Sequence, residues 1–313
     1  VIAASSRGVG GAPWALVVGD PGLDVIWADA LRPGTTRRAW TLGRARWCIQ
    51  DGDVIAPSDL SPKAELVIAP EGIDLLRTGR ASPDWDITPA RRRRPRPSSV
   101  ARWRHAVVAN PWAGDVLRDA SGFAGSSWFA DPIAERLRSA TPTPVLAGDR
   151  RMVVLYLPVG ASAIDLAAFA RELGDRAILG IRSADGRPVD IPAVLRATVV
   201  DVSAEPDVAG LLAAADIVVT DASPLSFAAA LAGIPIVIHA PRLDELVARI
   251  GMTVDLRTDG PGPVTATTDE LITTLRELID RDGAIHQSES AFGARGRADG
   301  SVAAIRTALR GGG

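Results

Sequence analysis

The sequence of 313 residues has few of the residue types that usually mark a disulfide, a metal site or a membrane span. Cys48 is the only cysteine, so an intramolecular disulfide is impossible and a reducing, cytoplasmic compartment is compatible. The three histidines are scattered without ligand spacing, so we expect no metal and no resident cofactor. No run of apolar residues reaches the length of a transmembrane helix, so we expect none.

Charge of one sign is also scarce in the chain as a whole. Lys and Arg total 35 against 37 Asp and Glu, a net charge of −2, so we expect no nucleic acid partner. One stretch differs, because residues 79–99 are polar, rich in proline and basic, which predicts a surface loop. Its run of Arg91, Arg92, Arg93 and Arg94 is either a solvated surface or a contact with an anionic membrane or polymer.

Short apolar, β-branched runs alternate with segments of helical character through much of the chain. This alternation predicts an α/β protein with doubly wound parallel sheets. A proline-containing stretch near residue 145 predicts two domains, 1–145 and 146–313, and all eight tryptophans fall in the first. Two such domains would enclose a ligand cleft. We expect a helix at Thr41–Cys48 and strands that include Ala15–Val18, Glu65–Ala69, His105–Asn110, Met152–Leu157 and Ala177–Arg182.

The most informative stretch of the chain is a predicted strand, turn, helix and strand in its second half. Ile217–Thr220 is typical of a buried parallel strand, and Ser223 is a good N-cap for a helix over Ser226–Leu231. Gly233 should end that helix before the next strand, Ile234–Ile238. Such a turn presents free N–H groups and attracts anions. The alternative is that Asp221 and Ser223 only cap the helix.

A family resemblance begins at this same turn. Thr220–Phe227, TDASPLSF, resembles the Thr-Asp-Tyr-Ser-Ser-x-x-Phe signature of the CDP-glycerol:poly(glycerol phosphate) glycerophosphotransferases, which build teichoic-acid polymers. Gly233–Val237, Leu243–Glu245 and Pro261–Leu271 are similar to later segments of that family. The resemblance covers the chain from about Arg150 and is thinner before it. It implies a GT-B fold, in which two Rossmann-like domains face a cleft and the C-terminal domain holds most of the nucleotide.

The resemblance also implies a reaction and its partners. A hydroxyl at the end of a lipid-linked polymer would attack the β-phosphorus of CDP-glycerol, a nucleotide-activated polyol, and CMP would leave. The enzyme would then work in the cytoplasm or on the inner face of the plasma membrane. The residues expected to bind substrate are Arg182, Asp221, Ser223, Ser226, Thr267 and Thr268. For Arg182 a solvated position is the alternative, and for Thr267 and Thr268 it is helix capping, since Thr267 and Glu270 have capping-box spacing.

Two histidines that act in the family are missing from the matching positions. Glu71 lies where the family has a Trp-His-Gly-Thr-Pro motif, and Ala184 lies where it has the histidine of an Arg-x-His-Pro motif. Glu71 is a candidate replacement base if burial raises its pKa, and a carboxylate at a helix N-terminus is the alternative. The hypotheses are therefore a glycerophosphotransferase with weakened or lost activity, a silent paralogue that binds a polymer or a partner enzyme, and a GT-B nucleotide-sugar glycosyltransferase.

Overall fold

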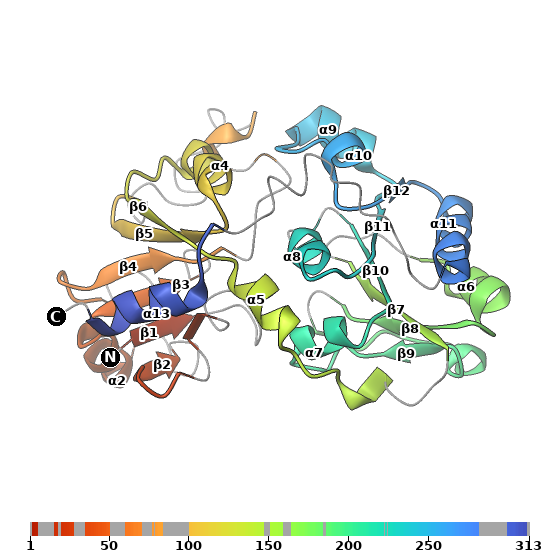
Figure 1. The fold of residues 1–313 in the computed structure, drawn as a ribbon, viewed down its shortest axis with the longest axis horizontal. Helices are drawn as coiled ribbons and strands as arrows, with labels where there is room; N and C mark the ends of the chain where they lie inside the picture. The colour runs from red at the N-terminus through yellow and green to blue at the C-terminus, as the bar shows by residue number, and fades with distance from the viewer. Residues whose placement is uncertain are drawn as a thin grey trace. The chain divides into compact units, whose positions relative to one another are not determined.

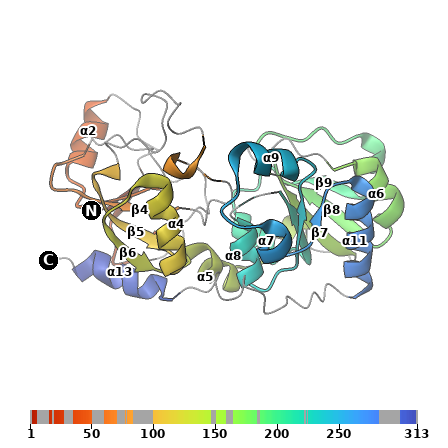
Figure 2. The same cartoon turned by 90° about the horizontal axis from the view of Figure 1, so that it is seen from above.

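The chain forms two compact units, Val1–Glu135 with Arg295–Gly313, and Arg136–Ala294 (Figure 1). Each is built around its own parallel sheet with helices on both faces (Figures 1 and 2). The structure is a computed structural model. It describes residues 2–5, 16–17, 20–27, 35–50, 60–70, 77, 79–83, 100–146, 151–158, 164–183, 186–221, 223, 225–281 and 299–311.

The sheet of the first unit has six parallel strands in the order β2-β1-β3-β4-β5-β6. The strands are β1 (Ile2–Ser5), β2 (Val25–Trp27), β3 (Trp47–Gln50), β4 (Glu65–Ile68), β5 (Trp103–Val108) and β6 (Ser126–Phe129). The helices are α2 (Thr36–Gly43), α4 (Pro111–Ser121) and α13 (Val302–Gly311), and α5 (Pro132–Arg138) crosses the boundary between the units.

Helices α2 and α4 cover one face of this sheet. Leu42 of α2 and Ala113 of α4 share a buried cluster with Leu66 and Ala106 of the sheet. Helix α4 starts at Pro111, because the Asn110 side chain accepts a hydrogen bond from the Ala113 N–H at 3.0 Å and proline occupies the first turn.

Helix α13 contacts Trp47, whose side chain points away from that cluster. The Trp47 indole N–H donates to the Leu309 carbonyl at 3.2 Å. The last helix of the chain therefore completes the first unit.

The second unit has a six-stranded parallel sheet in the order β12-β11-β10-β7-β8-β9. The strands are β7 (Met152–Leu157), β8 (Ala177–Ile181), β9 (Val199–Asp201), β10 (Ile217–Thr220), β11 (Ile236–His239) and β12 (Val264–Thr265). The helices are α6 (Leu166–Leu173), α7 (Val208–Ala213), α8 (Leu225–Leu231), α9 (Leu243–Ile250), α10 (Leu256–Asp259) and α11 (Thr268–Asp280).

The core of the second unit explains why its strands are apolar throughout. Helices α6 and α11 lie on one face of the sheet, and α7 and α8 lie on the other (Figures 1 and 2). Phe169 and Leu173 of α6 and Leu271 and Leu275 of α11 are fully buried against the sheet. Since both faces are covered, alternation of polar and apolar residues is not required, and the predicted doubly wound sheet is confirmed.

Two secondary-structure predictions in the first unit are wrong. Leu16 and Val17 are helical, and the first strand is instead β1, Ile2–Ser5. The helix expected over Thr41–Cys48 is α2, which ends at Gly43, and Trp47–Gln50 is a strand. Runs this short do not reveal their period, so only pairing with β1 and β4 decides the conformation of β3.

The domain division also differs from the predicted one. The sequence assigned everything after residue 145 to one domain, whereas Arg295–Gly313 belongs to the first unit. Arg310 forms an ion pair with the buried Asp20 carboxylate, and Arg306 Nε donates to the Leu16 carbonyl at 2.7 Å. Both contacts join residues about 290 positions apart, so no local pattern could reveal them.

Candidate functional site

The strand order of the second unit identifies one place on its sheet as the expected ligand site. From β7 the chain proceeds outward through β8 and β9, and β10 then starts on the other side of β7 and continues through β11 and β12. Ligands of open α/β sheets bind beyond the carboxyl ends of the strands at such a reversal. The Thr220 hydroxyl donates to the Leu157 carbonyl at 2.7 Å and joins the ends of β10 and β7 there.

The turn from β10 into α8 is held by its own serines. The Ser223 N–H donates to the Asp221 carbonyl at 2.7 Å, and Ser223 Oγ accepts from the Leu225 N–H at 3.2 Å. Ser226 Oγ donates to the Ser223 carbonyl at 2.7 Å, and both serines are buried. Ser223 lies two residues before the first residue of α8, and its hydroxyl accepts from the N–H of that residue. The two hydroxyls act on the turn itself, so they fix the direction of its backbone.

Gly233 ends helix α8 as predicted. Its φ is +87°, its N–H donates to the Ala230 carbonyl, and the Ile234 N–H donates to the Ala229 carbonyl. This is a Schellman motif, which favours glycine because of the left-handed backbone conformation. The similarity to the family at Gly233–Val237 therefore has a structural cause.

Arg182 lies directly after β8, at the same edge of the sheet. Its N–H continues the ladder to the Tyr156 carbonyl at 3.1 Å, and its Nε lies 3.5 Å from the Glu205 carbonyl oxygen. The side chain is half-buried. A guanidinium with this position adds a positive charge beside the expected ligand site.

The loop that follows Arg182 is tied to β9. Ser183 N–H donates to Ser203 Oγ at 3.0 Å, and the Asp201 carboxylate accepts from the N–H groups of Val189 and Ser203 at 3.1 and 2.9 Å. Burial raises the pKa of Asp201, but hydrogen bonds from Ser203 and Val189 outweigh it and leave that pKa below its ordinary value. The charged carboxylate fixes this loop, although Ala184 itself lies outside the described residues.

Thr267 and Thr268 start helix α11 after β12. Thr267 Oγ1 accepts from the Glu270 N–H at 3.2 Å and Glu270 Oε2 accepts from the Thr267 N–H at 3.2 Å, so the capping box is confirmed. Strands β8 and β12 are four positions apart in the sheet, which at ~4.8 Å per strand separates Arg182 from this turn by roughly 19 Å. A single diphosphate therefore cannot contact both Arg182 and the turn that carries Thr267 and Thr268.

The Pro-Gly-Pro similarity also has a structural basis. A side-chain carbon at Gly262 would lie 2.0 Å from the Ile236 carbonyl oxygen, so only glycine allows this approach. The following Pro263 carbonyl accepts from the Ile238 N–H at 2.8 Å and aligns β12 with β11.

His239 is a polar residue of this edge that the sequence interpretation missed. It ends β11, is buried, and its Nδ1 lies 3.0 Å from Thr265 Oγ1. Burial lowers the pKa of His239, and the nearby Glu270 carboxylate partly opposes that effect. Its position as the last residue of an apolar strand, at the edge where ligands bind, could have identified it from the sequence.

Several predicted functional residues fall on positions that the structure does not describe. Glu71 and the run Arg91–Arg94 lie outside the described residues, as do most of residues 79–99. Among the residues described, no group of three potential ligands is placed to hold a metal ion. In that same part of the chain, no helix is both long and apolar enough to cross a membrane.

Comparison with known proteins agrees with this geometry. The profile of the CDP-glycerol:poly(glycerophosphate) glycerophosphotransferase family matches residues 148–295, a range centred on the second unit. No curated protein sequence matches the chain.

Solved structures share the fold over both units. A variant of the wall teichoic acid polymerase TagF superposes with a TM-score of 0.72 at 16% identity, covering 95% of this chain and 84% of that chain. A TagF variant soaked with CDPG gives 0.67 at 18% identity, with 95% and 87% covered. A putative UDP-N-acetylglucosamine 2-epimerase from Listeria monocytogenes gives 0.54 at 12% identity, with 99% and 96% covered.

These likenesses confirm the predicted GT-B-like fold class of two Rossmann-like parallel-sheet units. The profile match falls on the strands, turns and helices that carry Arg182, Ser223 and Thr267. Residues 148–295 of this chain therefore resemble the CDP-glycerol:poly(glycerophosphate) glycerophosphotransferase family, as the sequence predicts.

Proposed function

We propose that this protein binds CDP-glycerol at the carboxyl edge of the second unit's sheet and is a glycerophosphotransferase with weakened or lost activity. One observation carries the proposal: the family match covers the unit whose strand order reverses at the Asp221–Ser226 turn. Fold alone would not suffice, because GT-B-like proteins perform several reactions.

In this proposal the nucleotide diphosphate lies between the turn after β10 and the end of β8. The Arg182 guanidinium supplies the positive potential, because the described N–H groups of the turn, at Ser223, Leu225 and Ser226, donate within the turn itself. Ser223 and Ser226 keep the turn in shape through the hydrogen bonds described above. Thr267 and Thr268, roughly four strands from Arg182, contact a different part of the bound substrates.

The proposed chemistry is an in-line phosphoryl transfer. A hydroxyl at the end of the polymer attacks the β-phosphorus of CDP-glycerol, the bond to the CMP oxygen breaks, and the hydroxyl proton passes to a base. Glu71 is the proposed base. Since alanine stands at position 184, the charge-stabilising histidine has no replacement there, and we expect turnover to be absent or very slow.

Calorimetric titration tests the donor site. We expect wild-type protein to bind CDP-glycerol in preference to CDP-ribitol and UDP-N-acetylglucosamine. Arg182→Ala should weaken binding by about 1.5–3 kcal/mol, the scale of a hydrogen bond to a charged group, and Ser223→Ala by about 1 kcal/mol. Arg176→Ala is the matched control, because Arg176 precedes the same strand at the opposite edge and pairs with Asp280.

Two results would redirect the proposal. If no nucleotide diphosphate binds at millimolar concentration, the silent-paralogue hypothesis replaces it. If a UDP-sugar binds more tightly than either CDP-polyol, the glycosyltransferase hypothesis does.

Release of CMP from CDP-glycerol with a lipid-linked glycerol-phosphate acceptor tests the catalytic part. Any residual activity should disappear in Glu71→Gln, which preserves size and removes the base. Robust turnover that survives this substitution would show that another group takes the proton.

We also propose that the protein contacts an anionic membrane from the cytoplasmic side. The Arg91–Arg94 run supplies charge worth ~1 kcal/mol per basic residue near such a surface. Helix α2 adds Trp40, which is 65% exposed, with the Arg44 guanidinium 4.6 Å from its ring centroid. Flotation with anionic vesicles should recover the protein, and Arg91–Arg94→Ser should abolish recovery. Equal recovery with neutral vesicles would contradict the proposal.

A further inference from the structure

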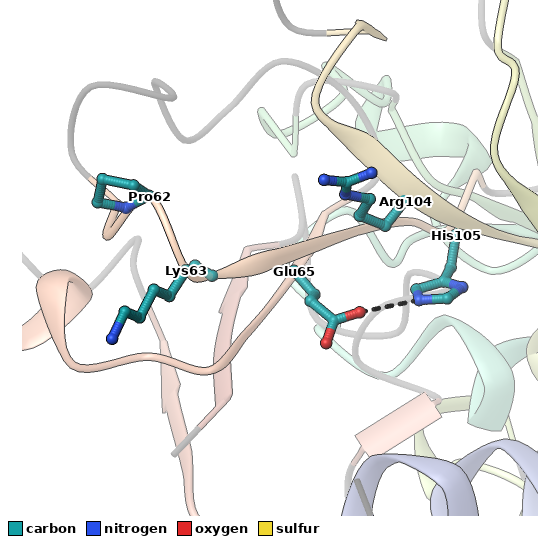
Figure 3. A pocket seen from close by; sticks show the side chains of 6 residues that line it. Pro62, Lys63, Glu65, Arg104 and His105 are labelled. Carbon is teal, nitrogen blue, oxygen red and sulfur yellow. Dashed lines mark hydrogen bonds and ion pairs between the residues drawn. The ribbon is translucent and has the colours of Figure 1, made fainter.

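The first unit has a pocket at the amino ends of its strands, the edge opposite to the one where α/β sheets usually bind ligands. Its volume is about 490 Å³, within the range of small-molecule sites. The lining residues are Pro62, Lys63, Ala64, Glu65, Arg104 and His105 (Figure 3).

A short turn before β4 carries Lys63 to the rim of this pocket. The Ala64 N–H donates to the Ser61 carbonyl at 3.0 Å, and the Lys63 N–H donates to Ser61 Oγ at 3.2 Å. Arg102 Nη2 also donates to the Ser61 carbonyl, at 3.3 Å. Three hydrogen bonds to one serine fix the backbone that carries the lysine.

A β-bulge brings Arg104 to the same pocket. Leu66 pairs with Trp103 and Val67 pairs with His105, so β5 has one extra residue at this point, which is Arg104. A bulge changes the direction of the side chain it carries. The regular ladder would not offer this arginine to the pocket.

The one carboxylate in the lining, Glu65, is held by His105 (Figure 3). His105 Nε2 lies 3.1 Å from Glu65 Oε2, and His105 Nδ1 lies 2.7 Å from Ser126 Oγ. Both ring nitrogens of His105 thus lie within hydrogen-bond distance of a side-chain oxygen. The ring also stacks on Trp128, with centroids 4.2 Å apart. This wall of the pocket is therefore fixed.

In contrast to Glu65, the cations that line the pocket are not held by a charged partner in the described part of the chain. Lys63 and Arg104 are exposed, and neither forms an ion pair with any residue that the structure describes. Two exposed cations and one engaged carboxylate thus line the pocket, so it favours an anion.

We propose that this pocket binds phosphodiester groups of an anionic polymer, at a site separate from the donor site. That the polymer is a glycerol phosphate chain rests on the proposed function. A volume of about 490 Å³ is far more than one phosphate ion occupies, so the pocket has room for a stretch of chain. A second point of attachment raises the effective concentration of the chain end during repeated encounters.

The composition of the chain makes a direct test possible, because Lys63 is its only lysine. Reductive methylation with ¹³C-formaldehyde keeps the charge and gives one dimethyl-lysine signal beside that of the terminal amine. Titration with a synthetic oligo(glycerol phosphate) should shift the lysine signal to saturation and leave the terminal amine unchanged. Raising the ionic strength from 0.05 to 0.5 M should weaken the response, as expected for exposed charges.

Substitutions of the lining sharpen the test. Arg104→Ala should raise the apparent dissociation constant up to about fivefold, the scale of one exposed ion pair, and Glu65→Gln should lower it by a similar factor. Arg118→Ala is the matched control, because this half-buried arginine of α4 pairs with Asp115 and does not line the pocket. It should change binding little.

The proposal is overturned if the Lys63 signal does not respond, or if it responds equally to inorganic phosphate at the same phosphate concentration. A response to phosphatidylglycerol vesicles without one to the oligomer would also overturn it. CDP-glycerol titration separates the two proposals, since a protein that binds the oligomer at Lys63 and no CDP-glycerol would contradict only the donor site.

Discussion

The two units have sheets of equal size but different strand order. In the second unit, β7 and β10 lie side by side at the centre of the sheet, which is the order of dinucleotide-binding folds. In the first unit, the strand order reverses between β1 and β3. Both orders create a ligand position at the carboxyl edge. In the second unit this edge carries a family signature and a hydrogen-bonded turn, whereas in the first the described polar cluster lies at the amino edge.

Although the two units share an architecture, their polar side chains are engaged in different ways. The second unit's polar residues at the ligand edge, such as Ser223 and Asp201, are engaged in positioning backbone. In the first unit, Lys63 and Arg104 are exposed and unpaired among described residues. The aromatic residues differ as well, because all eight tryptophans lie in the first unit and the single tyrosine, Tyr156, lies in the second. Tryptophan fluorescence therefore reports on one unit alone.

The largest expected effects on stability come from substitutions in the hydrophobic cores of the two units. Phe169→Ala should lower the free energy of unfolding of the second unit by about 3–5 kcal/mol, because it leaves a cavity in a fully buried cluster. The loss should be seen by far-UV circular dichroism and not by tryptophan fluorescence. Leu66→Ala, its counterpart in the first unit, should cost about 2–5 kcal/mol and shift the fluorescence transition.

Cys48 provides a second probe of the first unit. Burial raises the pKa of its thiol to about 12, and the Arg102 charge opposes this only in part. The thiol should react with Ellman's reagent only when that unit unfolds. Phe169→Ala and Leu66→Ala could instead each shift circular dichroism, tryptophan fluorescence and thiol reactivity together. The two units would then unfold as one, and the comparison between them would fail.

A smaller effect tests the place of the last helix. Arg310→Ala removes the hydrogen bond that, more than any other cause, holds the pKa of Asp20 below its usual value. Since the Asp20 side chain is buried, we expect a loss of about 1–3 kcal/mol. Urea denaturation followed by tryptophan fluorescence should detect it. A shift seen only in circular dichroism would place α13 with the second unit.

The capping box of α11 should contribute less. Thr267→Ala should cost about 1 kcal/mol, the typical value for a lost N-cap, with little effect on tryptophan fluorescence. Thr267→Ser keeps the accepting oxygen and should restore stability. If Thr267→Ala instead weakens CDP-glycerol binding without loss of stability, a ligand role outweighs the capping role.

The smallest expected effect is the pH dependence of the second unit. Burial holds the folded-state pKa of His239 below 6.5, so the unfolded chain binds the proton more readily. The unit should lose stability as the pH falls below 6.5, and the loss should level off below the folded pKa. Urea denaturation by circular dichroism between pH 7.5 and 5 should show this slope. His239→Asn should flatten it, and an unchanged slope would assign the effect to another group.

Much of the second unit follows from local sequence. Three predictions are confirmed: the strand Ile217–Thr220, the end of helix α8 at Gly233 and the capping box at Thr267. Each depends on neighbours only a few residues away, which is why a pattern could reveal it. The resemblance of residues 148–295 to the family followed from the same segments. The predicted substrate-binding roles remain proposals.

The structure of the first unit agrees less closely with the sequence predictions, because its elements depend on residues that are distant in the chain. β3 is a strand through its pairing with β1 and β4, and α13 joins this unit through Asp20 and Leu16. The pocket at Lys63 combines a turn, a bulge and a cross-strand histidine from three segments. Local propensity and short hydrogen bonds determined the turns, caps and family. Tertiary structure decided where the chain end packs and which charges meet, because those contacts join residues that no periodicity relates.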